Sequence, residues 1–237
     1  MKLLKSLPMG GRHLLDLLVV IVGILVAFQL DTWNQDRGHR KLLTAHYEGL
    51  SAEMVANRAQ LEQATRGVER QRALVDSILS MVGAQSEDVA AFNNYTFRLL
   101  RIDFPYIKRN AYQTLVTSGD VRLIKDYERK DQIISLYEFY DYVEIADKLH
   151  LESFQEYFFP YVMAHQDMHR GTPPDLSTYR DRAYSNTIAT LRYHLTVRLS
   201  RYHKCLELLD DVAQSDWVTT PTDEAAPPPA TKPATVE

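Results

Sequence analysis

Hydrophobic residues form one continuous stretch near the start of the chain, from Leu14 to Leu30, with the sequence LLDLLVVIVGILVAFQL. A helix rises about 1.5 Å per residue, so this stretch, extended to Trp33, approaches the ~30 Å thickness of a bilayer's hydrocarbon core. Asp16 lies in its first turn, where a carboxylate can reach the lipid headgroups. The pattern predicts a transmembrane helix over residues 14–33, preceded by a short arm over residues 1–13.

A cleaved signal peptide is the alternative interpretation of this stretch, since it has the same basic start and apolar middle. Signal peptides end in small residues around the cleavage site. Here Leu25 stands two positions before Ala27, and bulky Phe28 follows it. Trp33 is placed like an aromatic anchor at the membrane interface. Both observations favour an uncleaved membrane anchor.

Two features of the anchor predict contact with another transmembrane helix. Gly23 and Ala27 form a small-xxx-small pair, which lets helix backbones approach closely in lipid, and Gln29 can donate a hydrogen bond across such a contact. Asp16 completes this set of polar and small positions. A lone anchor with an incidental glycine is the competing interpretation.

Beyond the anchor, apolar positions recur in steps of four and three, which is a heptad pattern and predicts a long amphipathic helix. Asn57 and Gln71 are polar members of this seam, where such residues can fix register or oligomeric state. The helix either pairs with another chain as a coiled coil or packs on later helices of its own chain. Gly83 is expected to end it. The seam consists of Leu43, Tyr47, Leu50, Met54, Asn57, Leu61, Ala64, Val68, Gln71, Val75, Ile78 and Val82.

The rest of the chain predicts further helices and no strands. A short helix capped by Ser86 is expected to run through Leu100 and to close at Pro105, and another covers residues 109–117. Gly119 then stops the helix, although Ser118–Asp120 is also a candidate ligand loop. Longer helices are expected from Asp126 to Phe159 and over residues 181–212. The apolar positions expected to be buried in these two helices are Ile133, Leu136, Tyr137, Tyr140, Val143, Leu151, Phe154, Tyr157, Phe158, Ile188, Leu191, Leu195, Leu199, Tyr202, Leu206 and Leu209.

The expected fold class is therefore all-α: a transmembrane helix that continues into a long amphipathic helix and an antiparallel helical bundle. The α-helical soluble domain covers residues 34–216. Residues 217–237, rich in proline, alanine and threonine, cannot bury enough apolar surface to fold and are predicted to be disordered.

Charge and cysteine content narrow the choice of function. The formal net charge is −4, so the chain has no basic field for a nucleic-acid partner. Cys205 is the single cysteine, and its leucine-rich surroundings predict a small core residue.

Candidate chemistry is sparse. Tyr112, Tyr137 and Tyr140, with Tyr142, Tyr157 and Tyr161 nearby in the sequence, either line a pocket for a planar ligand or fill a helical core. His165 and His169 share a helical spacing but have no third ligand in the pattern, so no metal is expected. Signatures of serine nucleophiles, P-loops and dinucleotide sites are absent, and the chain is not expected to be an enzyme or to need a cofactor.

The anchor resembles the opening of a bacterial family of single-pass membrane proteins of unknown function. The matching stretch runs from Gly23 through Ala27 and Gln29 to Trp33 and Arg37, and the family also has an acidic residue seven positions before the glycine. Asp16 stands for the usual Glu, and Asp31 for Asn. A second, looser match starts at Ala111 and includes Ser118–Asp120 and Tyr137. The resemblance implies topology and architecture, without catalytic residues.

Two functions are expected alternatives. The first is a membrane-anchored scaffold or accessory subunit that binds copies of itself or another envelope protein. The second is a membrane-tethered sensor with a Tyr-lined pocket. The basic residues Lys2, Lys5 and Arg12 before the anchor are nearly balanced by Arg37, Arg40 and Lys41 after it. The terminal amine and the short N-terminal arm favour a cytoplasmic N-terminus, so the body is expected in the periplasm of a bacterial inner membrane.

Overall fold

The computed structural model describes residues 9–171 and 174–214, and within these ranges the chain is helical with no strand. The all-α prediction is therefore confirmed. The predicted tail over residues 217–237 and the first eight residues of the predicted arm lie outside this part of the chain. The elements are α1 (Met9–Gly83), α2 (Val89–Arg98), α3 (Asn110–Thr117), the 3-10 turn η1 (Asp120–Leu123), α4 (Tyr127–Ser153), the π-turn η2 (Phe154–Phe158), α5 (Phe159–His165), α6 (Leu176–Arg180) and α7 (Arg182–Gln214).

The chain divides into two compact units, with a boundary inside α1 between Tyr47 and Glu48. In the first unit, α1 begins at Met9, inside the predicted arm, and it includes the whole apolar stretch. This helix is long and apolar enough to span a membrane. From Asp16 to Leu30 the side chains are exposed: Ile21 and Val22 are 48% exposed, and Phe28 is 67% exposed.

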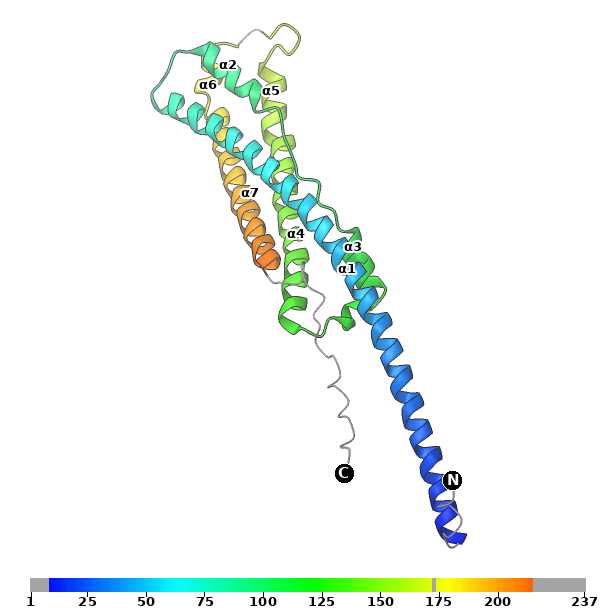
Figure 1. The fold of residues 1–237 in the computed structure, drawn as a ribbon. Coiled ribbons are helices and arrows are strands. Elements are labelled where there is room, and N and C mark those ends of the chain that lie inside the picture. The colour runs from blue at the N-terminus through cyan, green and yellow to red at the C-terminus, as the bar shows by residue number, and fades with distance from the viewer. Residues whose placement is uncertain (1–8, 172–173, 215–237) are drawn as a thin grey trace. The chain divides into compact units, whose positions relative to one another are not determined.

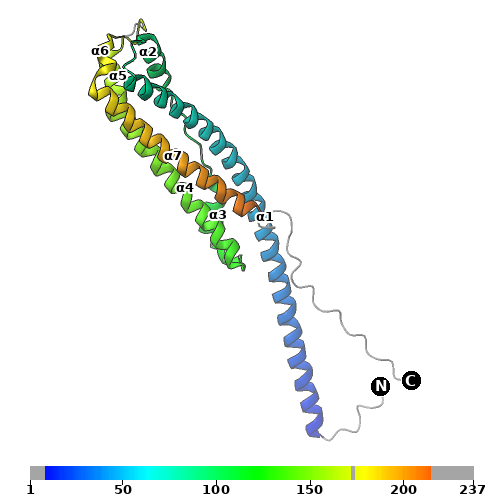
Figure 2. The ribbon, with the colours of Figure 1, turned by 90° about the vertical axis from the view of Figure 1, so that its left-hand side faces the viewer.

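The second unit is a bundle in which α4 and α7 pack side by side and α1 from Glu48 onward crosses them (Figures 1 and 2). α2, α5 and α6 gather at one end of this bundle. Along α1, the predicted seam is buried from Leu50 to Ile78, whereas Leu43, Tyr47 and Val82 are half-buried. Of the two interpretations of the heptads, packing on the chain's own helices is the one observed.

The segment between α2 and α3, residues 101–109, has no regular structure and lies along α1. We call it the strap. The Asn57 amide donates to the Lys108 carbonyl at 2.8 Å and accepts from the Lys108 N–H at 2.7 Å. Gln71 donates to the Arg101 carbonyl. The two polar seam residues therefore satisfy an extended backbone that has no sheet partner, which is what buried polar groups require.

Local signals set the ends of most helices. Asp126 accepts from the Arg129 N–H at 3.1 Å and caps α4 as predicted. Gly119 takes a left-handed φ of 77° after α3, which confirms the helix stop. The predicted cap at Ser86 is wrong, because Asp88 accepts from Ala91 N–H and α2 begins at Val89. α2 also ends at Arg98, well before Pro105.

The predicted helix from Asp126 to Phe159 is interrupted. α4 ends at Ser153, and a π-turn follows before α5. Pro160 lies just after this turn, and a proline ring clashes with the carbonyl four residues earlier in a regular α-helix. The wider turn removes that clash. It also rotates Tyr157 to the surface, where it is 52% exposed, so its predicted burial is wrong.

α7 agrees closely with the prediction, beginning at Arg182 and ending at Gln214. Ile188, Leu191, Leu195, Tyr202 and Leu209 are buried as expected, whereas Leu199, Leu206 and, on α4, Leu151 are half-buried. The core position between Leu195 and Tyr202 is taken by Arg198, which is 0% exposed. Cys205 is fully buried, as predicted.

Candidate functional site

The three tyrosines of the predicted pocket do come together, but they fill the space between themselves. Tyr112 stacks on Tyr137 with ring centroids 4.1 Å apart, and Tyr140 meets Tyr137 edge-on at 5.2 Å. Tyr137 and Tyr140 are 2% and 0% exposed. Tyr142 points to the surface. Of the two interpretations of these tyrosines, the contacts agree with the helical core.

Glu53 organises this aromatic core, and the sequence pattern did not single it out. Its carboxylate accepts from the Tyr137 hydroxyl at 2.6 Å and from the Ala111 N–H at 2.9 Å. The second bond places a negative charge at the N-terminus of α3, where free N–H groups favour an anion. Burial, and next the hydrogen bond to Glu53, raise the pKa of Tyr137.

A second buried polar cluster surrounds Arg198 on α7. Its guanidinium donates to Asp147 and to the strap carbonyl of Asp103, both at 2.8 Å, and to the Tyr202 hydroxyl at 2.9 Å. It also lies 4.8 Å from the ring centroid of Phe104. Burial raises the pKa of Asp147, and the neighbouring Arg198 charge opposes that effect. The cluster joins α4, α7 and the strap.

The histidines do not form a metal centre in the described residues. His165 Nδ1 lies 2.9 Å from the Tyr161 carbonyl, and His169 lies in the turn after α5. No group of three possible ligands is found in the part of the chain that the structure describes. His150 on α4 is 1% exposed beside Arg198 and His194, and burial lowers its pKa to about 3. It is therefore neutral at ordinary pH.

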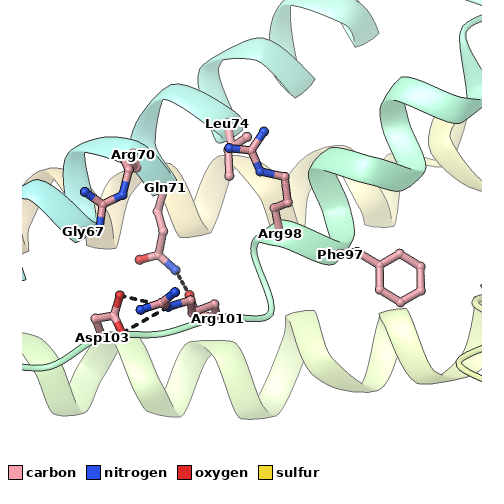
Figure 3. A pocket seen from close by; sticks show the side chains of 8 residues that line it. All are labelled: Gly67, Arg70, Gln71, Leu74, Phe97, Arg98, Arg101 and Asp103. Carbon is pink, nitrogen blue, oxygen red and sulfur yellow. Dashed lines mark hydrogen bonds and ion pairs between the residues drawn. The ribbon is translucent and has the colours of Figure 1, made fainter.

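A cleft of about 310 Å³ opens between α1, the end of α2 and the strap. Figure 3 shows Arg70 and Gln71 from α1, Arg98 from α2 and Arg101 from the strap around it. We call it the arginine cleft. Asp103 pairs with Arg101 at 3.3 Å (Oδ2 to Nε) and is the only acid among its described lining residues. The lining residues are Gly67, Arg70, Gln71, Leu74, Phe97, Arg98, Arg101 and Asp103.

Gly67 provides room in this cleft. A Cβ added there would lie 3.4 Å from Asp103 Oδ2 and 3.5 Å from its Cβ, both ordinary contact distances. Alanine therefore fits, and in a helix interior it is about 0.5–1 kcal/mol more favourable than glycine. α1 keeps the less stable residue at a place where the smaller side chain leaves the cleft open.

The strap wall of the cleft is held from two sides. Gln71, 8% exposed, donates to the Arg101 carbonyl, and Arg198, fully buried, donates to the Asp103 carbonyl. The backbone that carries Arg101 and Asp103 is thus fixed by side chains of α1 and α7. The sequence pattern identified Gln71 only as a seam residue and did not reveal the cleft, because Arg70 is far from Arg98 and Arg101 in the chain.

The predicted helix-contact residues all lie on the exposed first unit. Asp16, Gly23, Ala27 and Gln29 are exposed, and nothing lies within 4 Å of a Cβ built on Gly23. Ala27 and Gln29 are about 200° apart around a helix of 3.6 residues per turn. A partner on the Gly23 and Ala27 face therefore does not meet Gln29. Trp33 is 55% exposed.

Comparison of the chain with protein-family models, with curated proteins and with solved structures finds no match.

Proposed function

We propose that the protein is a membrane-anchored helical scaffold or accessory subunit that acts through protein–protein contacts. The observation that carries this proposal is the uncovered apolar stretch of α1. Its large side chains are about half exposed or more from Leu17 to Leu30, an arrangement that costs free energy in water and is favourable in lipid. The resemblance of this stretch to a family of single-pass membrane proteins agrees with it.

The packing of the bundle favours self-association through the anchor and not through the heptad seam. From Leu50 to Ile78 the heptad seam of α1 is covered by the chain itself, and Asn57 is bonded to the strap, so this part of the seam has no face left for a second chain. We therefore assign self-association to the Gly23 and Ala27 face of the anchor, in a bacterial inner membrane, with the bundle in the periplasm.

Single-cysteine crosslinking tests the association. Cys205 is buried and burial raises its thiol pKa to about 12, so the native thiol gives little background. In membranes, Val20→Cys, on the same face as Gly23, should form disulfide-linked dimers. The control Leu25→Cys, on the opposite side of the helix, should not. Equal crosslinking of the two variants, or none, would refute association through this face.

Two further measurements separate the anchor from its orientation. The protein should stay with the membrane after extraction at high pH, and its release would refute the anchor. An alkaline phosphatase fused to the C-terminus should be active. An inactive fusion beside an active cytoplasmic reporter would place the bundle in the cytoplasm.

A further inference from the structure

The arginine cleft has the charge and the shape of a small-anion site. Its lining carries three guanidinium groups and one carboxylate among the described residues, which leaves two positive charges in excess. Asp103 is occupied by Arg101. Arg70 and Arg98 are exposed at the cleft, and Figure 3 shows them on neighbouring elements of its upper side. A bound dianion would balance the remaining charge.

The size and rim of the cleft limit the ligand. A volume of about 310 Å³ is at the small end of ligand pockets, and Leu74 and Phe97 add apolar surface beside the arginines. Guanidinium groups pair bidentately with phosphate and carboxylate oxygens, and arginine is favoured where such planar recognition is needed. A small phosphate group fits this combination.

The cleft is also preorganised. Gln71 and Arg198 hold the two strap carbonyls on either side of residue 102, and Gly67 keeps the floor of the cleft open. Fixed walls reduce the ordering cost of binding. An incidental group of surface arginines needs neither a held backbone nor a glycine inside a long helix.

We propose that the arginine cleft binds a small phosphate dianion, either inorganic phosphate or the phosphate group of a small organic monoester. Arg70 and Arg98 bind the oxygens, Arg101 is oriented by Asp103 at the edge, and Leu74 and Phe97 contact the organic part where there is one. This site is independent of the proposed scaffold role, because it uses the bundle and not the anchor.

Calorimetric titration of the full-length protein in a nonionic detergent tests the proposal, with inorganic phosphate and phenyl phosphate as probes. Both should bind in the wild type. Tighter binding of phenyl phosphate would identify an organic monoester as the ligand class, and equal or weaker binding would identify the free anion. Absence of binding for both probes at a concentration on the order of 10 mM would overturn the site.

Matched variants locate the binding. Arg70→Gln and Arg98→Gln should each weaken binding at least about tenfold, since each loses a charge-assisted hydrogen bond. Arg66→Gln is the control, because Arg66 is exposed on α1 next to Gly67 but does not line the cleft. It should change affinity by less than about twofold. An equal loss in all three variants would show unspecific charge attraction and refute the site.

Gly67→Ala keeps every charge and adds one methyl group to the cleft. It should weaken binding several-fold while the thermal unfolding midpoint stays the same or rises, because alanine favours the helix. This variant separates binding from folding. Unchanged affinity for both probes in Gly67→Ala, together with unchanged affinity in the two arginine variants, would also overturn the proposal.

Discussion

Replacement of Arg198 by methionine should be the most damaging single change in the bundle. Methionine keeps an unbranched apolar stem but lacks the guanidinium, so it loses the ion pair with Asp147 and the bonds to the Asp103 carbonyl and Tyr202. Asp147 would then be a carboxylate with 13% side-chain exposure and no cationic partner at this position. Breaking a buried pair from one side costs about 3–5 kcal/mol, a large share of the total stability of a domain.

The pH dependence gives this prediction a second readout. Burial already raises the pKa of Asp147, and removal of the Arg198 charge raises it further. A raised carboxyl pKa means that the folded state binds a proton more readily than the unfolded state, so stability increases as pH falls through the folded pKa. The loss caused by Arg198→Met should therefore be largest at pH 7 and become smaller at mildly acidic pH.

Urea unfolding of the full-length protein in detergent, followed by circular dichroism, measures both effects. The double variant Arg198→Met/Asp147→Leu should be more stable than Arg198→Met alone, because it leaves no buried charge. Arg58→Met is the control, since Arg58 pairs with Asp210 at the surface and should cost at most about 1 kcal/mol. A loss below that of the control at pH 7, or additive losses in the double variant, would refute the reasoning.

Variants at three further positions test other parts of the bundle by the same unfolding assay. Burial lowers the pKa of His150 to about 3, so below about pH 6.5 the unfolded state binds a proton that the folded state does not, and stability falls as pH decreases toward 3. His150→Leu should reduce this slope by up to about 1.4 kcal/mol per pH unit. An unchanged slope would contradict the prediction. Glu53→Ala should lower the free energy of unfolding by about 2–3 kcal/mol, because the Tyr137 hydroxyl and the first turn of α3 lose their acceptor. A decrease under about 0.5 kcal/mol would show that Glu53 is dispensable for stability. Gly119→Ala should cost about 1–2 kcal/mol through its left-handed φ of 77° alone, since no atom lies within 4 Å of the added Cβ, and Gly119→Asn should recover part of the loss.

Local patterns predicted most of the fold for identifiable reasons. The heptad pattern of α1 predicts which face is buried from Leu50 to Ile78. It does so because a helix returns to the same face every 3.6 residues, regardless of which element packs against that face. Gly119 marks the end of α3 through its left-handed backbone, and Asp126 marks the start of α4 through a side-chain hydrogen bond, and both effects act over a few residues. The start of α2 was predicted wrongly at Ser86, because serine and aspartate both favour the N-cap position and the structure uses Asp88.

The candidate site could not be predicted in the same way. An arginine within a helical pattern is normally solvent-exposed, and Arg198 is buried only because Asp147, Tyr202 and the strap carbonyl of Asp103 meet it from other elements. The arginine cleft likewise combines residues of α1, α2 and the strap. Pairings between such distant segments have no periodic signal in one sequence. Pro160 was a visible sign of the π-turn, although it does not by itself show how the helix accommodates the ring.

The hydrogen bonds of Asn57 and Gln71 to the strap backbone fix the number of residues that the strap can have. Fourteen residues of α1 separate Asn57 from Gln71, or about 21 Å of helix. Seven residues separate Arg101 from Lys108, or about 23 Å of extended backbone. The two lengths agree, so the strap is nearly fully extended between its two points of attachment. Surface connections usually accept insertions and deletions, but one residue added to or removed from positions 102–107 would force either Asn57 or Gln71 to release its carbonyl, and length variation should be confined to the connections at the ends of the bundle.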